Sequence, residues 1–292
     1  MYNIYKFKEQ PLLVFTDIHG YFDAIENHIE SHDIRNCVMV IAGDIGLGFK
    51  PFNQYIDIFG KINKFLRLRN ITLLLLRGNH DDPTYFSEGK INFSNVKTIP
   101  DYSIISIYYE GDDNFEGLPK FNVLCVGGGV SIDRLRRIDG FESRKKLFKD
   151  FFPNATDEEV LDKVYPSYWV DEIPIYREDI LDEIKNDGIN IEHVITHTCP
   201  SFCFPTHKNN IQLWLKIDEG LNSILDYERT TMSLIYNKII EDKHTLTSWV
   251  YGHFHWRHDE TIKGVKFITL DNADKMFDLI EIEVGSYERE VE

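Results

Sequence analysis

Val-Met-Val-Ile-Ala-Gly-Asp, residues 38–44, is the stretch from which the fold of this chain is most readily inferred. An apolar run ends at a glycine and is followed by one carboxylate. Near-continuous apolar runs are typical of parallel strands that are buried on both faces. Sheets of such strands bind their ligands just beyond the carboxyl ends of the strands. We therefore expect Asp44 to lie in an active site.

Four further apolar runs end in the same way, with oxygen or imidazole donors directly after a strand. These donors are Asp17 and His19 after 12–16, Asn79, His80 and Asp81 after 72–77, His197 after 193–196, and His253 and His255 after 248–251. Each motif taken alone has an ordinary structural explanation; Asn79, for example, is a common turn residue. Their repetition at five strand ends instead favours a shared site that holds two metal ions, with Asp44 between them.

The order of the expected elements predicts an α/β fold. Strands at 12–16, 38–42 and 72–77 alternate with helices at 21–31 and 52–69, which is the pattern of a parallel sheet. Strands at 96–99, 103–109 and 122–126 follow without long helices between them, and they suggest a second, more antiparallel sheet. Helices at 176–186 and 221–241, the latter as one helix or as two pieces, and strands at 193–196, 248–251, 266–269 and 277–284 complete the expected elements.

A polar segment without clear periodicity, at about 131–175, follows the triple glycine at 127–129. We interpret it as an insertion folded over the mouth of the site, the alternative being a solvated surface excursion. Because there are no repeats or linkers, we expect one domain, residues 1–292, that contains this insertion.

Composition limits the classes of function. The 292 residues carry a formal net charge of −16, which argues against a broad basic surface for nucleic acids. A nucleic-acid substrate stays possible, because bound divalent metals can reverse the local field. Four scattered cysteines, an N-terminus without a signal-peptide pattern and the absence of a long apolar run predict a soluble, cytoplasmic protein without a membrane partner. The oligomeric state cannot be inferred.

The motif series resembles the calcineurin-like metallophosphoesterases, in particular small bacterial and phage-borne members. It consists of Asp17-x-His19, Gly43-Asp44, Gly78-Asn79-His80-Asp81, His197 and Gly252-His253-x-His255. The resemblance implies a four-layer α/β/β/α sandwich with two central mixed sheets. It also implies that Asp17, His19 and His255 bind one metal, that Asn79, His197 and His253 bind a second, and that Asp44 bridges them.

The resemblance further implies hydrolysis of a phosphate ester by a hydroxide that bridges the two metals. Imidazole and oxygen donors suit Mn²⁺, Fe²⁺ or Fe³⁺, Zn²⁺ or Ni²⁺. His80 would act on the leaving group, as a general acid or as a charge donor, and Asp81 would orient its ring. The alternative for His80 is simple loop packing.

The substrate is less defined by the sequence. The phosphoprotein phosphatases carry an Asp-Arg pair shortly after the bridging aspartate, whereas this chain has Ile45-Gly46-Leu47-Gly48, so that branch is disfavoured. Arg134 and Arg137 are one helical turn apart and could bind substrate phosphate; the alternative is a solvated basic turn. We expect a small phosphorylated or nucleotide-like substrate. The alternatives are a phosphodiesterase or nuclease acting on nucleic acid and, less favoured, a protein phosphatase or a non-catalytic scaffold.

Overall fold

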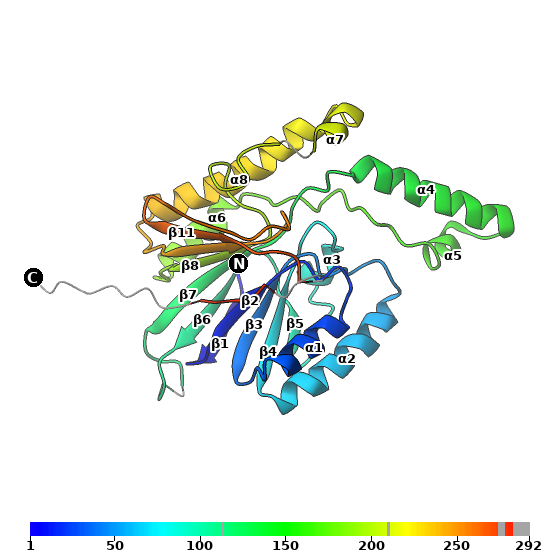
Figure 1. Ribbon diagram of the computed structural model, residues 1–292. Coiled ribbons are helices and arrows are strands. Elements are labelled where there is room, and N and C mark those ends of the chain that lie inside the picture. The colour runs from blue at the N-terminus through cyan, green and yellow to red at the C-terminus, as the bar shows by residue number, and fades with distance from the viewer. Residues whose placement is uncertain (113, 209–210, 274–277, 283–292) are drawn as a thin grey trace, which may run out of the picture.

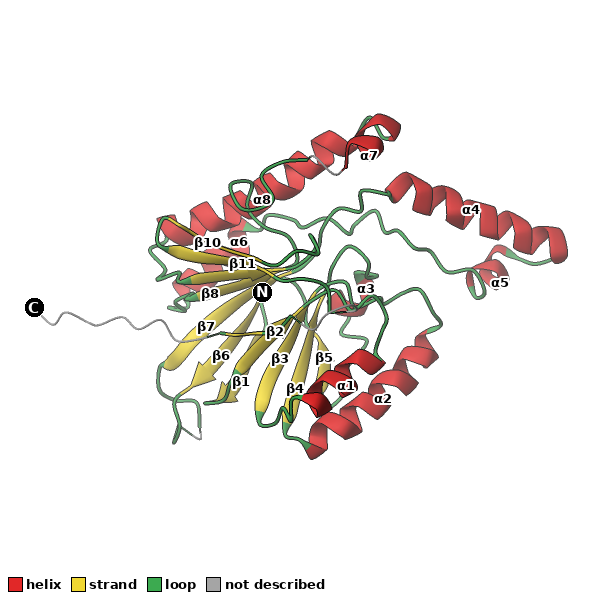
Figure 2. Cartoon of the chain, viewed as in Figure 1, coloured by secondary structure: helices red, strands yellow, loops and turns green. Residues whose placement is uncertain are grey.

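The computed structural model of the chain describes residues 1–112, 114–208, 211–273 and 278–282. Among these residues two sheets lie at the centre of the molecule, and helices cover both outer sides (Figures 1 and 2). This is the four-layer α/β/β/α arrangement that the sequence predicts. The carboxyl ends of the central parallel strands of both sheets meet at one edge of the sandwich.

The first sheet has five strands among the described residues, in the order β12-β2-β3-β4-β5. Their bounds are β12 Ile280–Glu281, β2 Leu12–Phe15, β3 Cys37–Ala42, β4 Ile71–Leu76 and β5 Val96–Thr98. The strands β2 to β5 are parallel, and β12 pairs antiparallel with β2. Every residue of β3 is buried, as expected for a central strand with both faces covered.

The second sheet has seven strands among the described residues, in the order β1-β6-β7-β8-β9-β11-β10. Their bounds are β1 Ile4–Lys8, β6 Ser103–Tyr108, β7 Pro119–Val126, β8 His193–Thr196, β9 Ser248–Tyr251, β11 Val265–Thr269 and β10 His258–Ile262. Of the pairs between these seven strands, β6–β7 and β10–β11 are antiparallel and the others are parallel. The sheet is therefore mixed and mainly parallel, less antiparallel than the sequence suggests.

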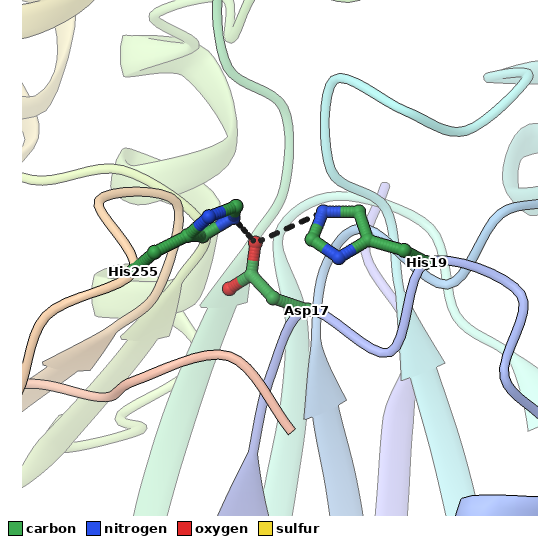
Figure 3. A group of neighbouring side chains, drawn as sticks. All are labelled: Asp17, His19 and His255. Atoms are coloured by element: carbon green, nitrogen blue, oxygen red, sulfur yellow. Dashed lines mark hydrogen bonds and ion pairs between the residues drawn. The ribbon is translucent and has the colours of Figure 1, made fainter. Parts of the chain in front are cut away.

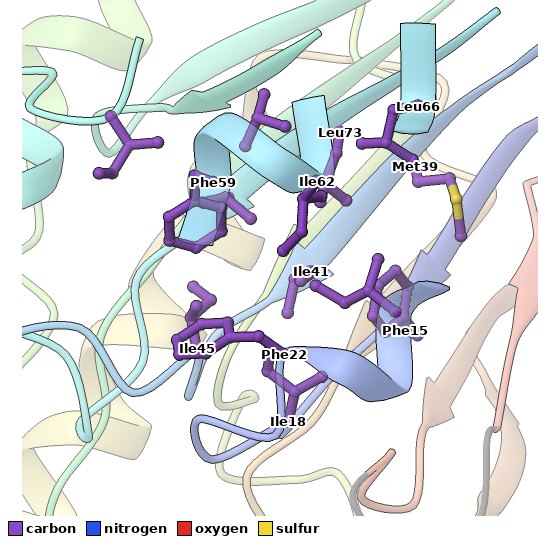
Figure 4. Packing of buried hydrophobic residues seen from close by; sticks show 14 of the residues in the cluster. Phe15, Ile18, Phe22, Met39, Ile41, Ile45, Phe59, Ile62, Leu66 and Leu73 are labelled. Atoms are coloured by element: carbon purple, nitrogen blue, oxygen red, sulfur yellow. The ribbon is translucent and has the colours of Figure 1, made fainter. Parts of the chain in front are cut away.

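Three apolar layers hold the sandwich together. Between the sheets lie inward side chains such as Val40 and Leu74 from the first sheet and Val123 and Ile195 from the second. Figure 4 shows the layer between the first sheet and its helices α1 (Asp23–Ser31) and α2 (Phe52–Leu68). A similar layer joins the second sheet to α6 (Glu178–Asn186) and α8 (Leu221–Glu241). The burial of this area of apolar surface is the main force that fixes the strand ends in place.

The segment after the triple glycine is largely helical, which the sequence did not indicate. Helix α4 spans Arg134–Phe151 and extends away from the sheets, with the short α5 (Asp157–Leu161) near its far end (Figure 1). None of the residues of α4 is buried, so its sequence carries no apolar periodicity that could reveal a helix. Helix α4 therefore does not fold over the site along its length, as was expected of this segment.

Several other expectations need correction. The strand near 96–99 belongs to the first sheet, where β5 pairs with β4, and not to the second. The strand β1, which was not expected, lies at the edge of the second sheet and pairs with β6. The short helices α3 (Thr84–Ser87) and α7 (Gln212–Ile217) were not expected. Of the strand expected at 277–284, Ile280–Glu281 is seen, and residues 277 and 283–284 lie outside the described part of the chain.

Candidate metal centre

The site forms where five strand ends converge. Loops after β2, β3, β4, β8 and β9 carry all seven residues that the sequence nominates as metal ligands. Five of these residues adopt left-handed backbone conformations with positive φ: Asp17, His19, Asp44, His253 and His255. Such conformations are unfavourable for residues other than glycine and cluster at functional sites. The sharp turns aim consecutive donors at one point.

One group of donors surrounds Asp17. Its Oδ1 lies 3.2 Å from Nε2 of His255 and 3.9 Å from Nε2 of His19. Figure 3 shows both imidazole rings directed at this oxygen from opposite sides. One ligand atom from each of the three residues lies within 4.8 Å of the other two, a spacing that can hold a metal ion. This group is the most open part of the site, since the His255 side chain is 40% exposed.

The second group lies deeper, around His197. Nε2 of this fully buried ring is 3.0 Å from Oδ1 of Asn79, and the His253 ring lies 5.0 Å away between centroids. Nδ1 of His197 lies 2.8 Å from the carbonyl oxygen of Ala42. If Nδ1 carries the proton and donates it to that carbonyl, Nε2 is left free to bind a metal, as is usual for histidine ligands.

Asp44 connects the two groups. Its Oδ2 is 3.4 Å from Nε2 of His19 in the first group, and its Oδ1 is 3.1 Å from Nε2 of His197 in the second. The backbone N–H of His80 donates to Oδ1 at 2.8 Å, which fixes the carboxylate. Asp44 thus has the position expected of a carboxylate between two cations.

Glycine is required where the loops touch. A Cβ atom on Gly78 would lie 2.1 Å from Oδ1 of Asp44, and one on Gly43 would lie 2.2 Å from Nδ1 of His197. Both distances are far below any real contact. The glycines before Asn79 and Asp44 therefore let neighbouring loops approach closely enough to share ligands.

Asp81 has a different role from the one expected. Its carboxylate accepts hydrogen bonds from the backbone N–H groups of Gly78, Ile45, Gly46 and Leu47, at 2.8–3.1 Å. It therefore joins the loop after β4 to the loop after β3 and does not orient the His80 ring. The assignment of Asp81 as a catalytic residue is replaced by this positioning role.

His80 lies on the wall of the site with its ring between an acid and a base. Its Nδ1 is 3.7 Å from Oδ2 of Asp44, and its Nε2 is 2.9 Å from Nη2 of Arg137. A guanidinium nitrogen can only donate, so Nε2 of His80 accepts and the ring proton sits on Nδ1. Burial, together with the nearby Arg137 charge, lowers the pKa of His80 although Asp44 acts in the opposite direction.

The charges of the donor set fit divalent cations. Burial opposes ionisation of Asp44, yet His80 and His197 hold the pKa of this carboxyl well below its usual range. Burial also opposes a charged His197, but the Asp44 carboxylate raises its pKa to about 10. By contrast, burial lowers the pKa of His253 to about 3, which leaves the neutral ring that a metal needs.

A cavity of about 830 Å³ opens above the donors. Its lining includes Asp44, Asn79, His80 and His253. The loop after β8, the α7–α8 region and the loop after β9 contribute aromatic and apolar residues, namely Phe204, Pro205, Ile211, Trp214, Leu225, Phe254 and Trp256. They also contribute polar and charged ones, namely Ser201, Thr206, His207, Lys208, Asp226 and Arg229. Pockets of this size and mixed lining are typical of sites for small molecules.

The two nominated arginines behave differently. Arg137 lines the cavity, held by Asp133 at 2.6 Å and by the carbonyl oxygen of Ser167 at 3.2 Å. Arg134 instead makes a two-pronged ion pair with the buried Asp218, at 2.5 and 2.9 Å, and is not among the cavity residues. The structure therefore does not place Arg134 where it could bind substrate phosphate.

Sequence reasoning missed two buried acids close to the donors. Glu228 of α8 lines the cavity, accepts from the backbone N–H of Val130 at 2.9 Å and lies 3.8 Å from Nε2 of His253. It interrupts an apolar stripe at helical spacing on α8, and this charge on a buried face was a signal. Glu172, by contrast, lies in a loop of the insertion, where no pattern points to burial.

Comparison with known proteins places the chain in a family. The model of the calcineurin-like phosphoesterase family matches residues 10–257, and the chain belongs to this family. It is accordingly a metal-dependent phosphoesterase. Curated proteins searched with the sequence give no match.

Solved structures with the same arrangement are distant. A dimetal phosphatase from Danio rerio is 12% identical with a TM-score of 0.40, and the match covers 90% of this chain and 87% of that one. A putative 5′-nucleotidase from Staphylococcus aureus is 14% identical with a TM-score of 0.43, and the match covers 94% of this chain but only 52% of that one. A phosphopantetheinyl hydrolase from Mycobacterium tuberculosis gives 12% and 0.37, covering 93% and 95%. At this distance none of the three bears on the substrate.

No helix in the described ranges is both long and apolar enough to cross a bilayer.

Proposed function

We propose that this protein hydrolyses phosphate esters of small, nucleotide-like molecules at a centre of two divalent cations. Asp17, His19 and His255 hold one cation, Asn79, His197 and His253 hold the other, and Asp44 binds both. The observation that carries the proposal is that four of these donors, Asp44, Asn79, His253 and His255, line a cavity whose lining also includes several aromatic side chains. The complete donor set also argues against a non-catalytic scaffold.

The roles of the chain's own residues follow from their contacts. When bound, the cations supply an activated water and neutralise charge on the phosphoryl oxygens. Asp44 and the histidines fix the cations, and Asp81 keeps the loops after β3 and β4 in register. The Nδ1–H group of His80 faces the site and acts on the leaving group, as a general acid or as a charge donor. Mn²⁺, iron, Zn²⁺ and Ni²⁺ all suit these donors.

Arg137 is the group best placed to bind substrate phosphate. Its guanidinium lines the cavity and lies beside His80, so a phosphoryl group at the donors comes within its reach. A guanidinium fork matches the geometry of phosphate oxygens. The aromatic side chains that line the same cavity, Trp214 and Phe254 among them, suit a planar or apolar leaving group such as a nucleoside.

A second candidate is a phosphodiesterase or nuclease activity, and one observation favours it. Helix α4 carries seven arginine or lysine residues against three acids, in a chain whose net charge is −16. This helix starts at the cavity, because Arg137 belongs to its first turns. A basic arm beside a phosphoesterase centre could hold the backbone of a nucleic acid.

A substrate panel separates these proposals. Purified protein with added Mn²⁺ is tested on an aryl phosphate monoester, an aryl phosphate diester, nucleoside monophosphates, cyclic nucleotides, dinucleoside polyphosphates and single-stranded DNA and RNA. Fastest turnover of a small nucleotide or monoester supports the main proposal. Turnover of nucleic acid that falls with rising salt supports the second. Protein without bound transition metal, inactive on every substrate with each added cation, would refute both.

The compartment and the domain organisation are part of the same proposal. The four cysteines are all free and buried, which suits a reducing compartment such as the cytoplasm. The two sheets share one apolar layer, which favours a single domain with α4 and α5 as an inserted arm.

A further inference from the structure

Two residues of the insertion form a buried chain of hydrogen bonds that ends on a nominated metal ligand. The Ser131 hydroxyl donates to Oε2 of Glu172 at 2.8 Å, and Nδ2 of Asn79 donates to the Ser131 hydroxyl at 3.0 Å. All three side chains are at most 2% exposed. We propose that Glu172, acting through Ser131, is a positioning residue that turns the carbonyl oxygen of Asn79 toward the second cation. This inference rests on the two-cation function proposed above.

The direction of each hydrogen bond fixes the direction of the next. Both groups of Ser131 that can donate are used by Glu172, because its backbone N–H also donates to Oε1 at 2.6 Å. The hydroxyl has a single proton, so toward Asn79 it can only accept. The Asn79 amide must then present Nδ2 to Ser131. Its Oδ1 is left facing Nε2 of His197 at 3.0 Å, where the second cation would bind.

An amide in the opposite orientation could not serve as a ligand. It would direct an NH₂ group, which carries two protons and no accessible lone pair, at the cation. Oxygen and nitrogen of an amide have nearly the same shape, so packing around Asn79 does not select between the two orientations. The selection has to come from hydrogen bonds, and Glu172 is the group that sets their direction.

The main chain around Glu172 is held independently of its carboxylate. The Arg77 guanidinium donates to the carbonyl oxygen of Glu172 at 2.7 Å and to those of Asp171 and Ile173 at 3.3 Å. Gly129 N–H also donates to the Glu172 carbonyl, at 3.1 Å. Because these bonds fix the return of the insertion to the body, the side chain can be changed without releasing the segment.

Burial raises the pKa of Glu172 to about 8 in the absence of cations. Two divalent cations nearby would favour the carboxylate again through their positive charge. When both cations are bound, we therefore expect Glu172 to be ionised, so that Ser131 donates to Glu172 and Asn79 donates to Ser131.

Glu172→Gln tests the relay because it reverses the order of donors and acceptors. The new glutamine side chain must offer its oxygen to Ser131 N–H, so its NH₂ group donates to the Ser131 hydroxyl. That hydroxyl then donates to Asn79, whose amide turns over. Calorimetric titration of metal-free protein with Mn²⁺ should show one of the two sites, the one that Asn79 belongs to, losing roughly 10–100-fold in affinity, the usual effect of losing a group that orients a ligand. The other site should change little.

The swap Asn79→Asp gives the sharper readout. A carboxylate at position 79 can only accept a hydrogen bond, so the Ser131 hydroxyl must donate to it. With the native Glu172 that hydroxyl donates to Glu172 instead, whereas after the Glu172→Gln change it is free to donate to position 79. We expect Glu172→Gln to weaken Mn²⁺ binding in the wild-type background but to strengthen it in the Asn79→Asp background. This reversal of sign isolates the pairwise coupling, and a purely structural role of Glu172 would not produce it.

The controls distinguish failure of the inference from failure of the proposed function. Glu192→Gln is the matched control. The Glu192 carboxylate also accepts a hydrogen bond from a backbone N–H group, in this case that of Asn122. Glu192 directly precedes β8, so it lies at the strand end away from the site. Ser131→Ala, which removes the relay without reversing it, replaces Glu172→Gln if that variant does not fold, and should also weaken the second site. If the wild-type protein binds two cations, either of two results overturns the inference. One is that Glu172→Gln binds Mn²⁺ as tightly as the wild type. The other is that Glu172→Gln changes Mn²⁺ affinity in the same direction in the wild-type and Asn79→Asp backgrounds. Wild-type protein that binds fewer than two cations overturns the proposed function and the inference together.

Discussion

Loop 77–82 and helix α4 both reach the cavity, the first from inside the fold and the second from its surface. The loop is largely buried, and the carboxylate of Asp81 fixes it through four backbone hydrogen bonds. The helix has no buried residue and touches the site only through its first turns. We therefore propose a division of labour, in which the strand-end loops determine the chemistry and helix α4 adjusts substrate binding.

The largest effect is expected from Asp44→Asn. The variant loses the charge shared by both groups of donors, so metal content should fall below two equivalents. Activity on an aryl phosphate ester should fall by at least about 10³-fold, since cations stabilise the transition state by several kcal/mol. Elemental analysis and steady-state kinetics measure the two quantities. Asp179→Asn, an exposed acid on α6, is the control. If Asp44→Asn keeps the metal content of the wild type, the assignment of Asp44 as the shared metal ligand is wrong.

His80→Ala should come next, and it separates binding from chemistry within the strand-end loops. The variant should keep its metals but lose roughly 10²–10⁴-fold in turnover, the range for positioned acid–base groups. The loss should shrink for an ester with a very good leaving group, which needs less help to depart. If elemental analysis instead shows that the variant has lost a metal, His80 is a ligand and its assignment is wrong.

Arg137→Ala tests the contribution of the insertion. Loss of a charged hydrogen bond to phosphate is worth about 1.5–3 kcal/mol, so kcat/KM should fall roughly 10–100-fold, with unchanged metal content. Arg136→Ala is a matched control, because Arg136 is exposed on the same helix and does not line the cavity. Equal kinetics in the two variants would mean that the insertion contributes no phosphate contact.

The smallest kinetic effect is expected from Arg134→Ala. Arg134 is engaged by Asp218, so kcat/KM should stay close to that of the wild type. Removing the guanidinium leaves Asp218 nearly buried and unpaired, at a cost of about 1–3 kcal/mol in the free energy of unfolding. The melting temperature of Arg134→Ala should therefore be several degrees below that of the wild type. A kinetic loss as large as that of Arg137→Ala would show that Arg134 leaves its ion pair to bind substrate.

The sequence predicts the parts of the fold that carry strong periodicity. The strand β3 is a continuous apolar run, and the helix α8, which spans Leu221–Glu241, carries an apolar stripe at helical spacing that Glu228 interrupts. Helix α4 was missed because none of its residues faces a core. The edge strand β1 has no fully buried residue, and β5 was assigned to the wrong sheet because pairing is a long-range property that composition does not record.

The site shows the same limit. Residues directly after buried strands could be nominated, because strand direction alone brings their ends together. The partners of those residues could not. Asp218 is 84 positions from Arg134, and the backbone donors to Asp81 lie mostly on another loop. Glu228 was also missed, although a charge within the apolar stripe of α8 was a signal that could have revealed it.

Three acids of the site, Asp17, Asp44 and Glu228, are each at most 2% exposed. One carboxylate oxygen of Asp17 and one of Asp44 lie within 4.8 Å of each other. The two carboxylates repel one another, and cations that bind only the folded chain offset this repulsion. Ligand-linked stabilisation reaches about 4 kcal/mol when a ligand is present at roughly 1,000 times its dissociation constant. The resistance of this protein to unfolding and proteolysis is therefore expected to follow the metal supply, so that metal starvation lowers its abundance as well as its activity.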